Sequence, residues 1–492
     1  MYSQAISELF EAASNFTQAS NVGNDFAKLG VEDEKPMLGW VQLPTWEDIQ
    51  LALDKILSTQ FISGRTRFIF CGTGGWIHAV NVVQELASSS NQQQVIGLHS
   101  LNPLELAALL KNQHNLKQTT CIGISLTRTT LETCLLIETL QEYFALGGLN
   151  PEEHFIWLTE VRENEKSSMI NHHFSLTVSG RADIGALFSA PSTLAMLLSM
   201  ALLLEKQLFV DSYQQLLANQ EVLLNRMAKR AYEISQFPGS ALWFQTEGKR
   251  HSYLERWILQ ITRQALGSKN SYSPANILVG KDNAPSGFAT IELNDFSADT
   301  ALARAMQAMY ACQIFVACLA YWWKISFVTH PEVKKYKKLV PQLLNSIDNA
   351  PPFEFCLVAD ADIRDLETVL LEKLHLLIEY QFVEIVFYPG LPLNICKKLE
   401  YYLCSKTKHY CRVYEGSDWN HHSFQFAIAN QQTLVIIVEI VNSFVSPSGF
   451  WNNTINRHTQ MLHSIARSTH IALGKSSLFI QWRPLGSIEF PI

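Results

Sequence analysis

Five short apolar runs alternate with helix-like segments between residues 67 and 178, and this alternation restricts the fold more than any other feature. The runs are Arg67–Cys71, Val95–His99, Cys121–Ile124, Phe155–Leu158 and Phe174–Val178. Apolar residues at helical spacing fill the segments between them, most clearly over 76–86 and 104–110. Strands that alternate with helices form parallel sheets, because a crossover helix returns the chain to the same edge. We therefore predict a three-layer αβα domain around a doubly wound parallel sheet.

Helix-like segments flank this region, and strand-like runs return after residue 270 and again after residue 346. A chain of 492 residues is long enough for several cores. We predict two αβα domains of similar plan, a helical N-terminal segment, and a mixed α/β C-terminal region that completes or extends the second domain. The expected boundaries are 1–60 for the N-terminal segment, 61–184 and 185–345 for the two domains, and 346–492 for the C-terminal region.

The composition indicates a globular protein without nucleic-acid or membrane partners. The chain is 47% apolar, and its net charge of −7 gives no attraction to nucleic acid or to an anionic membrane. Two apolar stretches, 194–204 and 311–328, are too short or carry polar residues, so we predict that both are buried within the protein. Nine scattered cysteines without a CxxC pair, and a start without a leader pattern, predict reduced thiols in a cytoplasmic protein.

Four hydroxyl residues follow the third strand-like run within six positions: Ser125, Thr127, Thr129 and Thr130. A helical pattern begins at Leu131, so the hydroxyls fall between a strand and a helix N-terminus, where free N–H groups and the helix dipole attract anions. The alternative is an ordinary helix N-cap with threonine-rich neighbours. The first strand ends in a glycine-rich turn, Gly72–Gly75. Ligands of doubly wound sheets bind beyond the carboxyl ends of the strands, where both turns fall.

Five spaced segments resemble motifs of the phosphoglucose isomerases, a family built from two sugar-isomerase (SIS) αβα domains. They are the glycine loop Gly72–Trp76, the hydroxyl loop Ser125–Thr133, the arginine motif Ser179–Asp183, the helix segment Gln260–Ser268 and the late motif His330–Lys337. These segments occur in the order of the family and span roughly residues 66–340. Nothing beyond about residue 345 resembles the family. The resemblance implies aldose–ketose isomerisation of a sugar phosphate through an enediol, without a cofactor and in a homodimer.

The resemblance also implies site residues. Those expected to bind a small-molecule substrate, phosphorylated or not, are Gly74, Gly75, Trp76, Ser125, Thr127, Arg128, Thr130 and Gln260. Arg181 matches the arginine that stabilises the enediolate, and Lys337 matches the lysine near the ring oxygen. The alternatives are an ion pair between Arg181 and Asp183, and a solvated basic run that contains Lys337.

The catalytic base is the main departure from the family, because Gln264 stands where the family has a glutamate. An amide accepts no proton, so this change removes a general-base contribution of about 10²–10⁴ in rate. The nearest carboxylate, Glu255, lies nine residues earlier in the sequence. His330 replaces a glutamine and is the leading substitute acid or base, since an ordinary histidine titrates near neutrality. The alternative is a histidine with no such role in the loop before Pro331.

Two further departures fall on the binding loops. Leu126 replaces the lysine of the hydroxyl loop, and Arg128 is close enough in sequence to restore the positive charge. Trp76 replaces the serine that closes the glycine loop. Its indole either fills the space of a sugar phosphate, offers a stacking face to a planar or apolar ligand, or packs in the core.

Three functions remain open from the sequence. The first is a divergent phosphosugar isomerase with a different base. The second is an enzyme repurposed for another enolisation, cyclisation or addition on a less charged substrate. The third is a non-catalytic protein that binds sugar phosphates. We predict no metal site, because the adjacent pairs His172-His173 and His421-His422 have diverging side chains.

Overall fold

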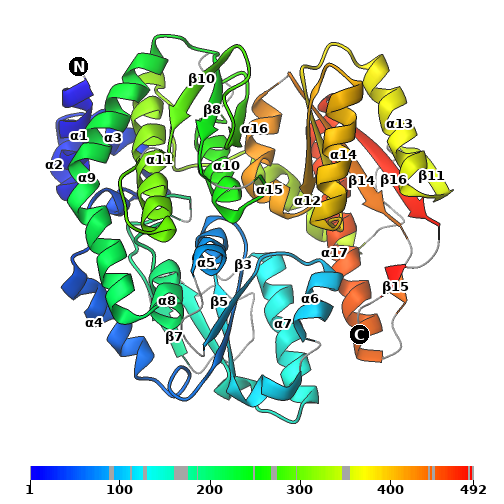
Figure 1. Ribbon diagram of the computed structural model, residues 1–492, viewed down its shortest axis with the longest axis horizontal. Coiled ribbons are helices and arrows are strands. Elements are labelled where there is room, and N and C mark those ends of the chain that lie inside the picture. The colour runs from blue at the N-terminus through cyan, green and yellow to red at the C-terminus, as the bar shows by residue number, and fades with distance from the viewer. Residues whose placement is uncertain are drawn as a thin grey trace. The chain divides into compact units, whose positions relative to one another are not determined.

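The fold is described from a computed structural model (Figure 1). It describes residues 2–485 and 488–489, apart from 88–92, 111–112, 126–129, 160–175, 186, 248–249, 268–273, 295, 346–354, 431, 442–443 and 446–448. The chain forms two compact units. Unit 1 comprises Met1–His99 and His114–Thr329, and unit 2 comprises Ser100–Gln113 and His330–Ile492.

The first sheet of unit 1 has the strand order β4-β3-β5-β6-β7, and all of its pairings are parallel. Its strands are β3 (Arg67–Gly72), β4 (Gln94–Leu98), β5 (Thr119–Ile124), β6 (Phe155–Thr159) and β7 (Leu176–Ser179). Every residue of β3, β5 and β6 is buried, as expected for a parallel sheet with both faces covered. The chain passes from β3 to β4 on one side and then to β5 on the other. Ligands of doubly wound sheets bind at this reversal, which lies between β3 and β5.

Helices cover this sheet and join it to the rest of unit 1. The main ones are α1 (Tyr2–Ser14), α4 (Trp46–Leu57), α5 (Gly75–Leu86), α7 (Leu131–Leu146), α8 (Leu194–Leu203) and α9 (Lys206–Ser235). Short helices α2 (Phe16–Asn21) and α3 (Asp25–Leu29) and a small β1–β2 hairpin (Val31–Glu32 and Lys35–Pro36) complete the N-terminal part. The described chain before residue 60 is thus mainly helical.

A second, smaller parallel sheet of unit 1 has the order β10-β8-β9. Its strands are β8 (Ala241–Gln245), β9 (Ile277–Gly280) and β10 (Phe288–Glu292), with helices α10 (Tyr253–Leu266) and α11 (Ala301–Trp323). In the first sheet, the strand that comes first in the sequence, β3, lies between the second, β4, and the third, β5. In the second sheet, β8 likewise lies between β9 and β10. The strand order of this sheet therefore reverses between β8 and β10.

Helix α11 is the core helix of unit 1. It is long and apolar enough to cross a membrane, but 94% of its most apolar window is buried inside the protein. This confirms the predicted burial of the apolar stretch around residues 311–323. The nine cysteines all carry free thiols, and most of them are buried.

Unit 2 contains a five-stranded parallel sheet of its own, with the order β11-β16-β14-β12-β13. The strands are β11 (Cys356–Ala361), β12 (Phe382–Tyr388), β13 (Tyr410–Glu415), β14 (Thr433–Ile440) and β16 (Ser477–Pro484). The helices are α6 (Pro103–Leu110), α12 (Val333–Asn345), α13 (Ile363–Leu376), α14 (Leu393–Lys406), α15 (Asp418–His422), α16 (Phe424–Ala429) and α17 (Gly449–Leu473). Contacts thus group α6 and α12 with the C-terminal sheet, whereas the sequence assigned both helices to the preceding domains. The predicted fold class, αβα with parallel sheets, is confirmed.

Candidate functional site

The glycine turn lies at the reversal point of the first sheet. β3 ends at Gly72, which pairs with Ile124 at the end of β5, so the two loops leave the sheet side by side. Gly74 precedes α5 with a φ of 79° and a ψ of −155°, a conformation that is essentially restricted to glycine. As a glycine, this N-cap residue has no side chain that could accept a hydrogen bond from α5. The turn therefore keeps the first N–H groups of α5 free of an N-cap side chain.

Gln260 on α10 lies directly against this turn. A Cβ on Gly74 would lie 2.7 Å from Nε2 of Gln260, so any other residue there would displace the end of this glutamine. Gln260 is 6% exposed, and its Oε1 has no hydrogen-bond partner within the described residues. The structure thus brings together two residues that the resemblance assigned to substrate binding.

Gln264 shares a face of α10 with Gln260. A separation of four residues turns a helix by about 40°, whereas Glu255 lies about 140° from Gln260 and about 180° from Gln264. Gln264 is 6% exposed. Glu255 is the one acidic residue of α10, so the face that meets the glycine turn carries amides and no carboxylate of this helix.

Glu255 is buried on the other side of α10. Its carboxylate accepts a hydrogen bond from the backbone N–H of His251, and burial raises its pKa to about 7. The nearby Arg250, Arg256 and Arg263 act in the opposite direction, but their effect is smaller. A carboxyl group with this pKa is suited to proton transfer, yet it faces away from the glutamines.

The hydroxyl loop begins beside the glycine turn. Ser125 follows β5, is 6% exposed, and donates its backbone N–H to Leu158 with an N···O distance of 3.3 Å. Thr130 is the N-cap of α7, but its side chain makes no capping hydrogen bond. Within the described residues, the buried Thr133 hydroxyl also has no partner. Leu126, Thr127 and Arg128 lie outside the described residues.

Trp76 lies in the first turn of α5 and is 5% exposed. Its indole Nε1 has no partner in the described part of the chain. Since so little of the ring is accessible, core packing describes this side chain better than an open stacking face does. Gly75 precedes it as the first residue of the helix.

Arg181 makes the ion pair that the sequence offered as its alternative role. Its Nε and Nη2 donate to the two carboxylate oxygens of Asp183 at 3.0 and 2.7 Å, and its Nη1 donates to the carbonyl of Gln42 at 3.2 Å. Arg181 follows β7, which is three strands from β3, or about 14 Å at ordinary strand spacing. Within unit 1 the guanidinium is therefore held at the edge strand rather than at the glycine turn.

His330 and Lys337 belong to unit 2. Burial lowers the pKa of His330 to about 4, with smaller contributions from Lys337, Lys334 and His421. The expectation that this histidine titrates near neutrality is wrong, because desolvation and neighbouring positive charges keep it neutral. Its Nδ1 is buried without a partner in the described part of unit 2. Lys337 is exposed on α12, as expected of a basic run.

A cluster at the ends of α5 and β4 was missed by the sequence analysis. The rings of His78 and His99 lie 5.7 Å apart, and Tyr253 packs within 6.2 Å of both. Arg256 donates from Nη1 to Nε2 of His99 at 2.9 Å. This contact requires a neutral His99 whose other ring nitrogen carries the proton. The only sequence signal was the position of His99 at the end of a strand-like run.

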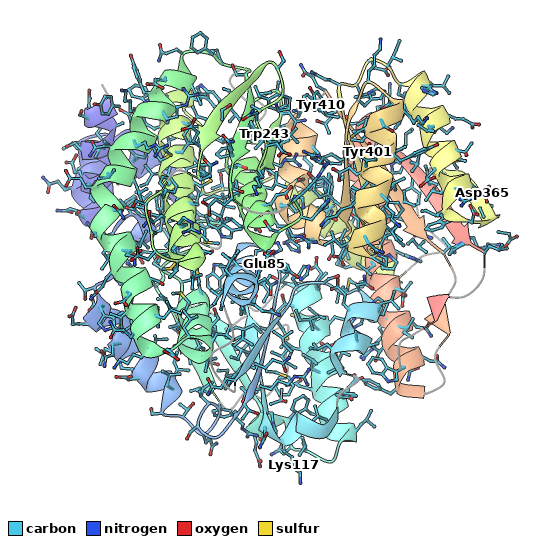
Figure 2. All side chains as sticks on the ribbon, viewed as in Figure 1. Glu85, Lys117, Trp243, Asp365, Tyr401 and Tyr410 are labelled. Atoms are coloured by element: carbon cyan, nitrogen blue, oxygen red, sulfur yellow. The ribbon has the colours of Figure 1, made fainter. Side chains whose placement is uncertain are left out.

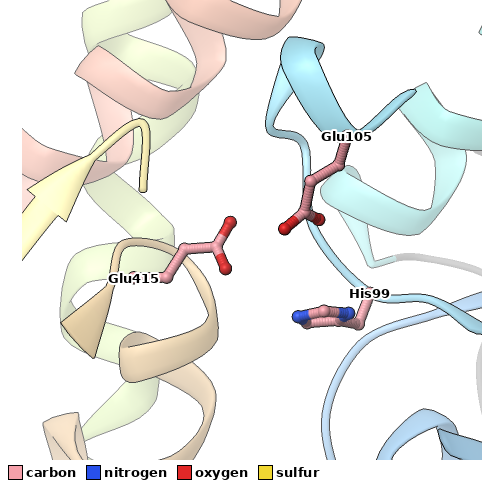
Figure 3. A group of neighbouring side chains, drawn as sticks. All are labelled: His99, Glu105 and Glu415. Atoms are coloured by element: carbon pink, nitrogen blue, oxygen red, sulfur yellow. The ribbon is translucent and has the colours of Figure 1, made fainter. Parts of the chain in front are cut away.

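Figure 3 shows two neighbouring carboxylates of unit 2, Glu105 on α6 and Glu415 at the end of β13; it also labels His99, which belongs to unit 1. Carboxylate oxygens of the two glutamates lie within 4.8 Å of each other. The Ser100 hydroxyl donates to Glu415, and Glu105 is exposed. Exposed acidic pairs are common without an ion, so we assign no metal to this pair.

No protein-family model and no curated protein matches the chain. Among solved structures, it resembles a glucose-6-phosphate isomerase from Chlamydia trachomatis D/UW-3/Cx, with a TM-score of 0.51 and 14% identity over 69% of this chain and 86% of that one. This chain has a sugar-isomerase-like fold. A hypothetical protein from Thermus thermophilus matches with a TM-score of 0.49 and 16% identity, over 70% of this chain and 97% of that one.

Proposed function

We propose that the chain binds a small hydroxylated ligand, a sugar or sugar phosphate, on a sugar-isomerase scaffold, and that it does not isomerise this ligand by the carboxylate route. The ligand would lie beside the contact between Gly74 and Gln260, beyond the carboxyl ends of β3 and β5. The reversal of strand order at these two strands supports this position.

One observation carries the proposal: the face of α10 that meets Gly74 bears Gln260 and Gln264, and the only acidic residue of α10 lies on its opposite face. Enolisation needs a base within hydrogen-bond reach of the carbon-bound proton. An amide binds a hydroxyl as donor and acceptor but takes up no proton. The arrangement therefore suits recognition of hydroxyl groups and lacks the base of the family reaction.

The polar groups around the turn fit a ligand with several oxygen atoms. The Oε1 of Gln260 and the Thr133 hydroxyl are buried without partners in the described residues, and each leaves a hydrogen bond to be made. The Thr130 side chain makes no capping hydrogen bond to α7 within the described residues, and the positive end of the helix dipole favours an anion at this N-terminus. These features favour a phosphorylated ligand over a neutral one.

An enzyme with another base is the second candidate, and His99 is the observation that favours it. His99 directly follows Leu98, which pairs with Cys71, so it leaves the sheet beside the glycine turn. Its neutral ring is held by Arg256. Nε2 of His99 would have to release the N–H of Arg256 before it could accept a proton, and another enolisation would then not need Gln264.

A coupled assay with fructose 6-phosphate and glucose 6-phosphate, together with calorimetric titration of both sugars, tests the proposal. We expect binding of a sugar phosphate and no turnover above buffer for the natural protein. Gln264→Glu should introduce measurable isomerisation, because it restores a carboxylate on the face that meets Gly74. Gln264→Asn is the matched control, since it changes the same position without a base.

Two outcomes would contradict the proposal. Turnover by the natural protein that Gln264→Asn leaves unchanged would show that another base works, and its loss in His99→Asn would identify that base. If neither sugar phosphate binds to the natural protein, and folded Gly74→Ala gives the same result, the proposed binding of sugar phosphates is refuted. Homodimer formation and a cytoplasmic location remain expectations from the sequence.

A further inference from the structure

We propose that unit 1 holds a second small-molecule site, in a pocket beyond the carboxyl ends of β8 and β10, that takes a small amphipathic amine. The pocket has a volume of about 220 Å³. At about 30 Å³ for each water molecule, this is room for roughly seven waters or a ligand of comparable size. No residue that lines it belongs to the glycine turn or to the glutamine face of α10.

The pocket occupies the position that the topology of the second sheet favours. β8 and β10 are the strands between which the order reverses, and ligands of open parallel sheets bind outside the carboxyl ends at such a point. Glu247 follows β8, and Leu293 and Asn294 follow β10; all three line the pocket. The position is thus equivalent to that of the glycine turn in the first sheet.

The floor of the pocket is apolar because of the residue spacing on α11. Small residues at the first, fifth and eighth positions of α11 share one face of the helix and leave space beside it. Three larger side chains form the remaining apolar walls of the pocket. The alanines are Ala301, Ala305 and Ala308, and the larger side chains are Leu254, Leu293 and Phe296. A ligand would bury an aliphatic or aromatic body here.

Arg304 is held in place at the rim with donors to spare. Its Nε donates to Glu247 at 2.8 Å, and its Nη1 donates to the carbonyl of Ala298 at 3.0 Å. Its Nη2 makes no hydrogen bond to any residue that the structure describes. A fixed guanidinium with a free edge is suited to a carboxylate or hydroxyl oxygen of a ligand.

Glu85, which is labelled in Figure 2, lies at the end of α5. It supplies the second carboxylate of the pocket. One of its oxygens accepts a hydrogen bond from the N–H of Tyr253 at 3.1 Å, which satisfies the first turn of α10. Ser252 and Thr300 cap α10 and α11 with their hydroxyls. The helix N-termini at the pocket are therefore already satisfied and do not call for an anion.

The charges select the chemistry of the ligand. Glu85 and Glu247 against Arg304 give the lining a net charge of −1, because two carboxylates face one guanidinium. The half-buried amide of Asn294 makes no hydrogen bond to any described residue and adds a neutral donor and acceptor. An ammonium group pairs with the carboxylates, an oxygen acceptor pairs with Arg304, and an apolar body fills the floor. A sugar phosphate dianion is repelled by the same lining.

Calorimetric titration of the full chain with three related probes tests this site. They are L-leucine, 3-methylbutylamine, which lacks the carboxylate, and 4-methylpentanoate, which lacks the amine. We expect leucine and the amine to bind with dissociation constants of about 0.1–1 mM, and the acid to bind at least tenfold more weakly. Equal binding of the acid and the amine, or no binding of any probe at ten times that concentration, would overturn the proposal.

Variants separate this site from the rest of the molecule. Glu85→Gln keeps an acceptor for Tyr253 but removes the charge, and should weaken amine binding about tenfold. Ala305→Leu fills the floor and should abolish binding of all probes, with a circular dichroism spectrum like that of the natural protein. Glu233→Gln, which changes a carboxylate paired with Arg230 outside the pocket, is the matched control and should change nothing. Equal weakening by Glu85→Gln and Glu233→Gln would refute the site. Sugar phosphate binding should not respond to Glu85→Gln, so this proposal stands or fails independently of the proposed function.

Discussion

Replacing Gly74 by alanine tests the close approach that defines the candidate site. The new Cβ meets two obstacles: a backbone with φ of 79° and ψ of −155°, and the Nε2 of Gln260 at 2.7 Å. The backbone conformation alone costs about 1–3 kcal/mol for a residue with a side chain. The amide must also move within a buried environment, since Gln260 is only 6% exposed. We expect Gly74→Ala to lower the free energy of unfolding by about 2–4 kcal/mol.

The two contributions are separable by urea unfolding of three further variants. Gly148 has a similar φ of 74°, but a Cβ there would meet nothing within 4 Å, so Gly148→Ala reports backbone strain alone. We expect it to cost about 1 kcal/mol. In a Gln260→Ala background, Gly74→Ala should cost about 1 kcal/mol less than in the natural chain, because the clashing amide is gone. Equal costs at Gly74 and Gly148, or no relief from Gln260→Ala, would refute the close approach of the turn and α10.

The pH dependence of unfolding provides two further predictions, measured by urea unfolding between about pH 4 and pH 8. The pKa of Glu255 is raised from 4.5 to about 7, so the folded state holds its proton longer; the contribution of this group to stability should be lost as the pH rises between these values, by about 3 kcal/mol in total. The difference in stability between the natural chain and Glu255→Gln isolates this contribution, and a difference that does not change with pH would contradict the buried carboxyl. The pKa of His330 is lowered from 6.5 to about 4, so the unfolded state binds the proton first and stability should fall as the pH drops through this range. His458 shifts in the same direction, so His330→Gln should remove only part of this acid sensitivity, and a profile identical to that of the natural chain would be inconsistent with the buried imidazole.

The sequence predicted most strands of the parallel sheets because these strands are buried on both faces. Short, continuous apolar runs such as those of β3, β5 and β12, which alternate with helices, are typical of strands in a parallel sheet that is covered on both faces. β8, β11 and β13 were not predicted. β13 alternates buried and partly exposed residues at the edge of its sheet, and β8 has only three fully buried residues. Short or edge strands carry a weaker hydrophobic pattern, so periodicity alone does not find them.

The grouping of the chain into units was beyond the reach of the sequence for a different reason. Residues 100–113 lie between two strands of the first sheet but pack with unit 2, and α12 packs mainly against α17, more than one hundred residues later. Such long-range packing depends on which apolar faces meet. A local pattern states that a face is apolar but not what covers it.

The candidate site was predicted in part. Motif order identified Gly74 and Gln260, which the structure brings together, and the ion pair of Arg181 with Asp183 was one of two readings of that motif. The raised pKa of Glu255 and the lowered pKa of His330 were not predictable, because both arise from burial by residues distant in sequence. The cluster around His99 was missed since a lone histidine after a strand has no distinctive spacing.

Both sheets of unit 1 have a point at which the strand order reverses, but different side chains surround the two points. At the reversal point of the first sheet, Trp76 and Gln260 are almost fully buried and the turn packs against α10. At the reversal point of the second sheet, the alanine face of α11 leaves a pocket, and Arg304 and Glu85 at its rim have hydrogen-bonding atoms without a partner among the described residues. The absence of a carboxylate from the face of α10 that meets Gly74 weakens the case for chemistry at the first position but has no bearing on the second. Binding measurements at both positions, rather than an isomerase assay alone, are therefore the measurements that decide what this scaffold does.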